Sequence, residues 1–130
     1  MSTCGLWLGA QRLCAVVVED DGRRHRPIRA APTPEACAAL FAWLSSRDIH
    51  TLVIGQRNPT LIAQAHAAHL HVQLAPRTWL EAIRSLTGYS RRPHHDSAAL
   101  LARWPLTPGL RSLLRECRPT NPPAQQLPLL

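Results

Sequence analysis

Two histidines and an acid stand side by side late in the chain, at His94, His95 and Asp96. Imidazole nitrogens beside a carboxylate oxygen are a donor set that Zn²⁺ or Mn²⁺ accepts. The alternative interpretation is structural. Asp96 precedes Ser97 at the expected start of a helix, where a carboxylate accepts backbone N–H bonds as an N-cap. The sequence leaves both interpretations open.

Other potential ligands and nucleophiles give weaker patterns. His66, His69 and His71 could share a metal, or could mark a solvated helix end. The cysteines have no CxxC spacing, stand within apolar segments, and therefore predict buried thiols without a disulfide framework or zinc site. These cysteines are Cys4, Cys14, Cys37 and Cys117.

Arginine supplies all of the positive charge. The chain has 15 basic residues, none of them lysine, against 8 acidic residues, which gives a net charge of +7. Guanidinium groups suit phosphates, and Trp79 or Trp104 could stack on a base. The alternative is a surface that reflects codon bias. The arginines predicted to bind nucleic acid are Arg57, Arg91, Arg92, Arg111 and Arg115.

Length and composition predict one folded unit. Residues 1–118 are expected to form the domain, and residues 119–130 a flexible, proline-rich tail. With 45% hydrophobic residues the chain can bury a core. Because no leader pattern and no run of about 20 apolar residues occurs, we expect a cytoplasmic protein without a membrane partner.

Hydrophobic periodicity predicts an α/β domain that opens with a buried hairpin, followed by an edge strand. Thr33 and Asn58 are expected to cap the first two helices, and Thr78 with Glu81 to form a capping box at the third. A long last helix is expected to carry arginines on its outer side. The predicted strands lie at 4–8, 13–18, 24–30, 50–55 and 71–74, and the helices at 33–46, 58–69, 78–86, 96–104 and 107–118.

The opening motif Gly5-Leu6-Trp7-Leu8-Gly9, with a second apolar strand ending in an acidic turn, resembles the start of RuvC-like ribonuclease H folds. That group includes Holliday-junction resolvases, YqgF-type proteins and DEDD transposases. The predicted order βββαβαβα agrees with the resemblance. It implies a five-stranded mixed sheet flanked by helices, here with an extra C-terminal helix.

The same resemblance implies two Mg²⁺ ions held by clustered carboxylates. The positions expected for these acids hold Trp7, Gly55 and Asp96, so most of the set is missing. The late block resembles the resolvase ending when Asp96 is aligned with its acid. In the transposase register, His94 and Ser97 take the acidic positions instead. A resolvase relative and a transposase-derived protein therefore remain alternatives.

Three functions follow from this pattern. The first is a degenerate RuvC-like protein that needs no cofactor and binds DNA or structured RNA. The second is a divergent Mg²⁺- or Mn²⁺-dependent endonuclease that uses Asp96 as a catalytic remnant, with His94 and His95 as further metal ligands. The third is a scaffold that binds a protein partner or a second copy of itself.

Overall fold

The computed structural model describes residues 2–87 and 93–118. The strands are β1 (Ser2–Leu8), β2 (Leu13–Glu19), β3 (Ile28–Ala30), β4 (Thr51–Ile54), β5 (His71–Leu74) and β6 (Arg115–Cys117). The helices are α1 (Pro34–Ser46), α2 (Pro59–Ala67), α3 (Arg77–Thr87), α4 (Pro93–Arg103) and α5 (Pro108–Arg111), with a 3₁₀ turn at Trp104–Leu106.

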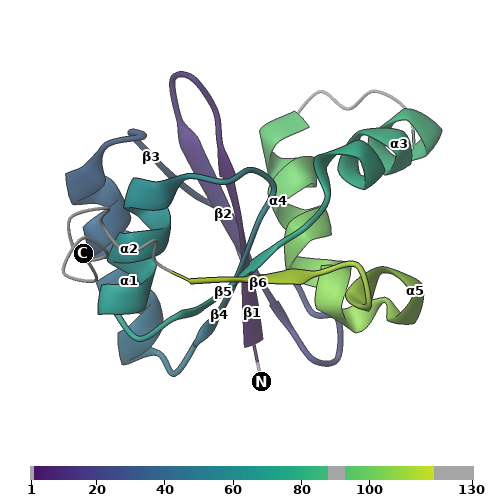
Figure 1. The fold of residues 1–130 in the computed structure, drawn as a ribbon. Coiled ribbons are helices and arrows are strands. Elements are labelled where there is room, and N and C mark those ends of the chain that lie inside the picture. Colours follow the sequence, from purple (N-terminus) through teal and green to yellow (C-terminus); the bar gives the residue numbers. More distant parts are fainter. Residues whose placement is uncertain (1, 88–92, 119–130) are drawn as a thin grey trace, which may run out of the picture.

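The strands form one mixed sheet in the order β3-β2-β1-β4-β5-β6 (Figure 1). β1 and β2 pair antiparallel over their whole length, and β3 extends this pairing at one edge. β4 lies parallel to β1, and β5 lies parallel to β4, as right-handed crossovers through helices require. The predicted α/β architecture and the order of the first eight elements are therefore confirmed.

Helices cover both faces of the sheet, with α1 and α2 on one side and α3, α4 and α5 on the other (Figure 1). Because strand side chains alternate between faces, β1 sends Cys4 and Leu6 into the core beneath α1 and α2. Trp7 points to the opposite face and packs on two smaller clusters formed with α4 and its neighbours. The alternation predicted for β1 is confirmed.

Gly5 allows α4 to lie directly on β1. A Cβ atom at this position would come within 2.0 Å of the Ala98 carbonyl oxygen and 2.4 Å of the Ala102 backbone nitrogen. No side chain can occupy that space, so glycine fixes the depth at which α4 packs on the sheet.

The first two helices begin as the sequence predicts. The Thr33 hydroxyl accepts a hydrogen bond from the Ala36 N–H at 3.2 Å. The Asn58 side-chain oxygen accepts one from the Leu61 N–H at 3.1 Å. In both helices proline follows the cap, where its missing N–H leaves no helical bond unmade.

The C-terminal part differs from the prediction. The expected helix over 107–118 is only α5, and the chain then turns into β6, which pairs antiparallel with β5 and makes the sheet six-stranded. The predicted arginine stripe is therefore wrong, because Arg111 ends α5, Arg115 begins β6 and Arg118 follows it. Trp104 is fully buried and donates from Nε1 to the Leu110 carbonyl at 2.8 Å, so it has no free face for a base.

Two further helix starts are also corrected. α3 begins at Arg77, so Thr78 lies inside the helix and does not cap it. α4 begins at Pro93, which places Asp96 in the first helical turn and not at the N-cap. Proline at the first helical position was the start signal there.

The predicted tail at 119–130 lies outside the described residues. Within the described ranges, no helix combines the length and the apolar character that a membrane span requires.

Candidate nucleic-acid interface

Trp7 and Gly55 lie next to each other where β1 and β4 end. Leu6 pairs with Ile54 in the parallel register, which brings the following residue of each strand into contact. A Cβ atom on Gly55 would lie 3.3 Å from Cζ3 of the Trp7 ring and 3.2 Å from Cδ2 of Leu80. The ring and the leucine therefore occupy the space that a side chain at position 55 would need.

A cation lies over the same ring. The guanidinium carbon of Arg84, on α3, is 5.9 Å from the centre of the Trp7 ring, within the range of a cation–π contact. The indole also packs against the clusters that include Ala98 and Leu101 of α4 and Trp104. The region where the resemblance predicts clustered carboxylates is thus aromatic and positively charged.

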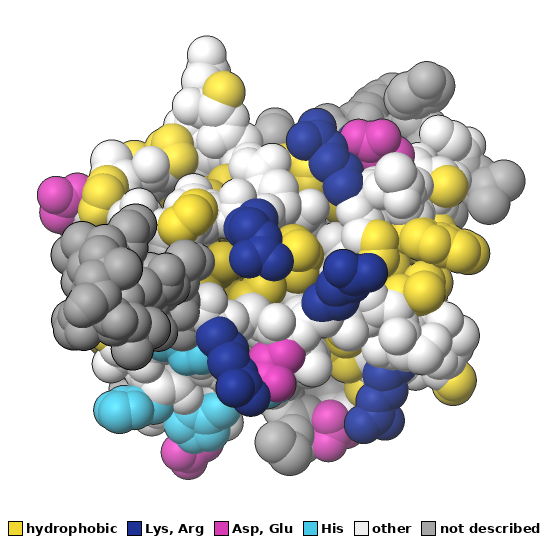
Figure 2. Space-filling view, in the orientation of Figure 1, with side chains coloured by type: hydrophobic (Ala, Val, Ile, Leu, Met, Phe, Trp, Pro, Cys, Tyr) yellow, Lys and Arg dark blue, Asp and Glu magenta, His cyan; other side chains and the backbone are white. Residues whose placement is uncertain are grey.

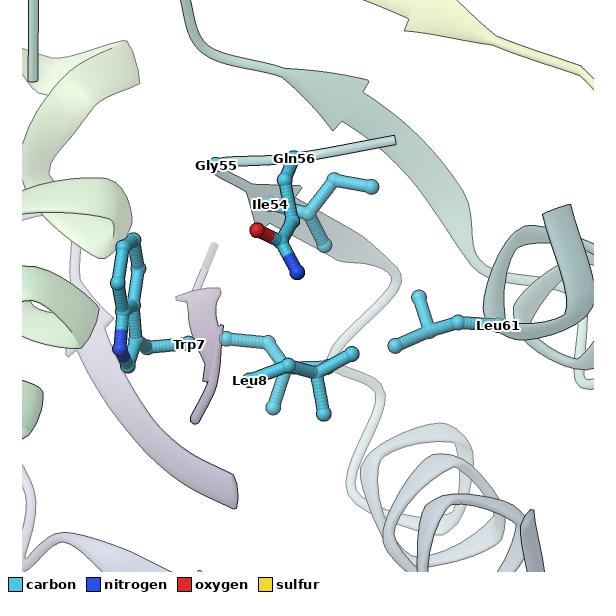
Figure 3. A pocket seen from close by; sticks show the side chains of 7 residues that line it. Trp7, Leu8, Ile54, Gly55, Gln56 and Leu61 are labelled. Atoms are coloured by element: carbon cyan, nitrogen blue, oxygen red, sulfur yellow. The ribbon is translucent and has the colours of Figure 1, made fainter. Parts of the chain in front are cut away.

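Figure 3 shows the pocket beside this contact. Trp7 lies on one side of β1, Leu8 and Leu61 lie on the other, and the Gln56 amide lies between them. The enclosed space is too small for more than about one water molecule. The pocket therefore has no room for a small-molecule substrate.

Asp96 is solvent-exposed in the first turn of α4. The side chains of His94 and His95 lie outside what the structure describes. The metal site predicted at His94, His95 and Asp96 therefore stays a prediction. The neighbouring Ser97 hydroxyl is buried and has no hydrogen-bond partner among the described residues. Among the described residues, no group of three His, Cys, Asp or Glu side chains is placed to hold a metal ion.

The pair of Mg²⁺ ions implied by the resemblance does not fit these residues. Mg²⁺ takes oxygen ligands in octahedral geometry, and paired ions need several shared carboxylates. Trp7 and Gly55 supply no side-chain oxygen, and the indole lies against Gly55 where β1 and β4 end. Asp96 alone cannot balance two dications.

In the second histidine group, His66 and His71 make contacts within the fold. His66 Nε2 lies 2.6 Å from the Cys117 carbonyl oxygen and links α2 to β6. His71 Nδ1 lies 3.5 Å from a carboxylate oxygen of Glu116. These contacts engage two of the three histidines with β6, and the three do not form a metal-binding group in the described structure.

Three of the predicted arginines are described, and all three are exposed. Arg57 follows β4. Burial raises the pKa of the Cys117 thiol, and the nearby charge of Arg57 lowers it by a smaller amount. Arg57 therefore lies close enough to β6 for its charge to act there. Arg111 and Arg115 lie on α5 and β6. Figure 2 shows arginines spread across this face and not gathered in one stripe. Arg91 and Arg92 lie outside the described residues.

Two arginines on α3 are not among those that the sequence pattern predicts to bind nucleic acid. Arg77 opens the helix and pairs with Glu81, with Nε 3.0 Å from Oε1, and Arg84 covers Trp7. The order of strands and helices could have indicated both residues. Loops after parallel strands share the carboxyl edge of the sheet, and α3 follows β5 there. Arg12 in the β1–β2 hairpin and Arg57 after β4 reach the same edge, because β1, β4 and β5 all end there.

Acidic residues concentrate at the opposite end. Asp20 and Asp21 lie in the β2–β3 turn, directly after Glu19, which ends β2 and pairs in register with Ser2, the first residue of β1. Asp48 precedes β4. The turn acids are far from the carboxyl edge, as their position in the sequence predicts, so they cannot replace the missing metal ligands.

The cysteines are confirmed as free, buried thiols. Burial raises the pKa of Cys4 to about 12, with a smaller contribution from Cys14. Burial also raises the pKa of the other three. A nucleophilic cysteine needs the reverse shift, so this chemistry receives no support at these positions.

No protein-family model matches the chain, and no curated protein matches it in sequence. A solved structure, T. thermophilus RuvC in complex with Holliday junction substrate, matches with a TM-score of 0.63 at 13% sequence identity. The match covers 90% of this chain and 99% of the RuvC chain. The chain therefore has the ribonuclease H-like fold of RuvC.

Proposed function

We propose that this protein is a catalytically degenerate RuvC-like domain that acts by binding structured nucleic acid. The observation that carries the proposal is the contact between Trp7 and Gly55, with Arg84 over the ring, at the edge where this fold would place its carboxylates. An edge that attracts phosphate and lacks metal ligands is suited to binding without cleavage.

The loss of catalysis follows from the chemistry of phosphodiester cleavage. Two-metal hydrolysis needs ions that stabilise both the attacking and the leaving oxygen. An indole in place of the first carboxylate supplies no ligand and covers Gly55, where the resemblance implies the second carboxylate. The nearby guanidinium groups also repel a dication.

Binding is supported by the charges at the carboxyl edge. Arg12, Arg57, Arg77 and Arg84 come from different loops and helices but follow the carboxyl ends of the three parallel strands. Arg77 pairs with Glu81 in an exposed ion pair, and phosphate can compete with an exposed pair of this kind. The solved RuvC structure holds a Holliday junction, and on this chain we propose a related shape-dependent partner.

The proposal is tested by fluorescence anisotropy with labelled four-way junction, duplex DNA, single strands and structured RNA at two salt concentrations. Mg²⁺ and Mn²⁺ are present, so that cleavage is read from the same samples. We expect salt-sensitive binding without cleavage. Metal-dependent cleavage would establish the divergent nuclease instead, and absence of all binding would favour the protein scaffold.

A matched pair of charge reversals localises the interface. Arg57→Glu changes the carboxyl edge, whereas Arg47→Glu makes the same charge change after α1, where Arg47 covers Trp43 at 5.2 Å. We expect the first variant to weaken binding by at least tenfold and the second by much less. Equal losses would show attraction by net charge alone.

A further inference from the structure

Trp79 is the most exposed of the four tryptophans. Trp7 packs against α4 and Arg84, Trp43 lies beneath Arg47, and Trp104 is buried with its N–H bonded to Leu110. Trp79 is 50% exposed, against 38% for Trp43. Its half-exposed indole offers an aromatic face to a ligand.

The position of this ring is fixed by its neighbour. Leu80 is fully buried, and its Cδ2 would lie 3.2 Å from a Cβ on Gly55, which anchors the first turns of α3 against the end of β4. Trp79 therefore stands one residue away from the contact that fills the expected catalytic position. Figure 1 shows α3 at the end of the sheet where the β1–β2 hairpin also lies.

The surroundings of Trp79 suit a nucleotide. Arg77 lies two residues earlier on α3, on a different side of the helix, and its guanidinium group is exposed in an ion pair with Glu81. Arg57 follows β4, whose end Leu80 contacts. An exposed aromatic ring on an edge of the sheet that also carries guanidinium groups combines the two features with which proteins bind single-stranded nucleic acid, because every base has a π-face and every linkage a charge.

From this arrangement we propose that Trp79 stacks on an unpaired base, so that the protein prefers nucleic acid with unpaired bases to continuous duplex. The inference rests on the proposed nucleic-acid function and adds a substrate class to it. In a duplex the bases already stack on each other, and an exposed indole on a rigid helix gains little from them. In a single strand or at an open junction the base faces are available.

The test compares two 20-nucleotide probes with equal phosphates, oligo-dT and a strand of abasic sites. We expect Trp79→Ala to weaken binding of oligo-dT about tenfold and leave binding of the abasic strand unchanged. Trp79→Phe, which keeps an aromatic face, should restore most of the affinity. The matched control is Trp43→Ala, which removes the other exposed indole at 38% exposure and should change neither probe.

Intrinsic fluorescence gives a second measurement. Oligo-dT should quench the emission of the wild-type protein and of Trp43→Phe, and this quenching should be lost in Trp79→Phe. Equal binding of oligo-dT by Trp79→Ala and Trp43→Ala would overturn the inference while the proposed function stands. Equal losses on both probes would also overturn it, by showing a structural role. If the wild-type protein binds no nucleic acid, the proposed function itself fails.

Discussion

The Trp7 ring lies directly against Gly55 where β1 and β4 end. The space above Gly55 is closed by the Trp7 ring, since a Cβ there would lie 3.3 Å from Cζ3 and 3.6 Å from Cε3 of the indole. The two positions at which the resemblance implies carboxylates are therefore in contact. A Cβ at position 55 would require the indole and Leu80 to shift by a few tenths of an ångström, so the two positions are coupled.

This coupling predicts non-additive stability changes. Trp7→Ala should cost about 3 kcal/mol through the cavity it leaves. Gly55→Ala should cost about 1 to 2 kcal/mol by overpacking. In the double variant the alanine at 55 enters the vacated space, so we expect urea denaturation to give a total about 1 kcal/mol or more below the sum.

Part of the destabilisation remains in the double variant, because Cδ2 of Leu80 would still lie 3.2 Å from the new Cβ at position 55. Gly109 supplies the control, since a Cβ there meets nothing within 4 Å. Trp7→Ala combined with Gly109→Ala should be additive. Additivity at position 55 as well would show that the ring and the glycine are not in contact.

Gly5 gives the strictest stability prediction. In Gly5→Ala the new methyl would lie 2.0 Å from the Ala98 carbonyl oxygen, so α4 must move away from β1. We expect a loss of more than about 4 kcal/mol or failure to fold, measured by circular dichroism and urea denaturation. Gly109→Ala should be neutral or stabilising by up to about 1 kcal/mol. A well-folded, stable Gly5→Ala protein would mean that α4 packs elsewhere.

The sequence was sufficient for the first eight elements because each has a strong local signal. The unbroken apolar run Leu13–Val18 is typical of a strand buried on both faces, and Thr33 and Asn58 are clear helix caps. Alternation along β1 also placed Trp7 on the correct face. These signals lie within each element and need no knowledge of its neighbours.

The C-terminal segment was not predictable in this way. Leu110, Leu113, Leu114 and Cys117 have helical spacing, yet Cys117 belongs to a strand. Long-range contacts decide the outcome, namely pairing with β5 and the hydrogen bond between His66 and the Cys117 carbonyl. The contact of Arg84 with Trp7 likewise depends on how α3 packs, so spacing alone could not reveal it.

The buried thiols predict slow chemical modification. Since burial raises the pKa of Cys4 to about 12, the folded protein keeps this thiol protonated at pH 8, and iodoacetamide should react rapidly only after denaturation. An unfolded thiol ionises near pH 9, whereas Cys4 in the folded protein keeps its proton up to about pH 12. The raised pKa therefore lowers stability only above about pH 9, and its contribution to the free energy of unfolding is complete below that pH and declines between about 9 and 12. Rapid alkylation of native protein, read by mass spectrometry, would contradict this burial.

The segment between α3 and α4 gives the prediction for binding. Arg91→Ala with Arg92→Ala should weaken binding of DNA or RNA and flatten the dependence of log K on log salt by about 2, because two phosphate contacts are lost. Arg23→Ala with Arg47→Ala removes the same charge near the amino ends of β1 and β4, where Arg23 pairs with Glu19. An unchanged affinity in the first variant would exclude this segment from the interface.

Divalent metal distinguishes a binding protein from a divergent nuclease. Titration calorimetry should detect no tight Mg²⁺ binding to the wild-type protein, because no group of three His, Cys, Asp or Glu side chains among the described residues is placed to hold a metal ion. Trp7→Asp alone should not restore cleavage, since Gly55 still supplies no ligand, and Asp96→Ala should leave the calorimetric baseline unchanged. A micromolar Mg²⁺ or Mn²⁺ site that disappears in Asp96→Ala would instead assign a metal to Asp96 with His94 and His95. Cleavage by Trp7→Asp would show that a further carboxylate reaches this site. Asp96 and one new carboxylate on β1 are too few to hold two metal ions.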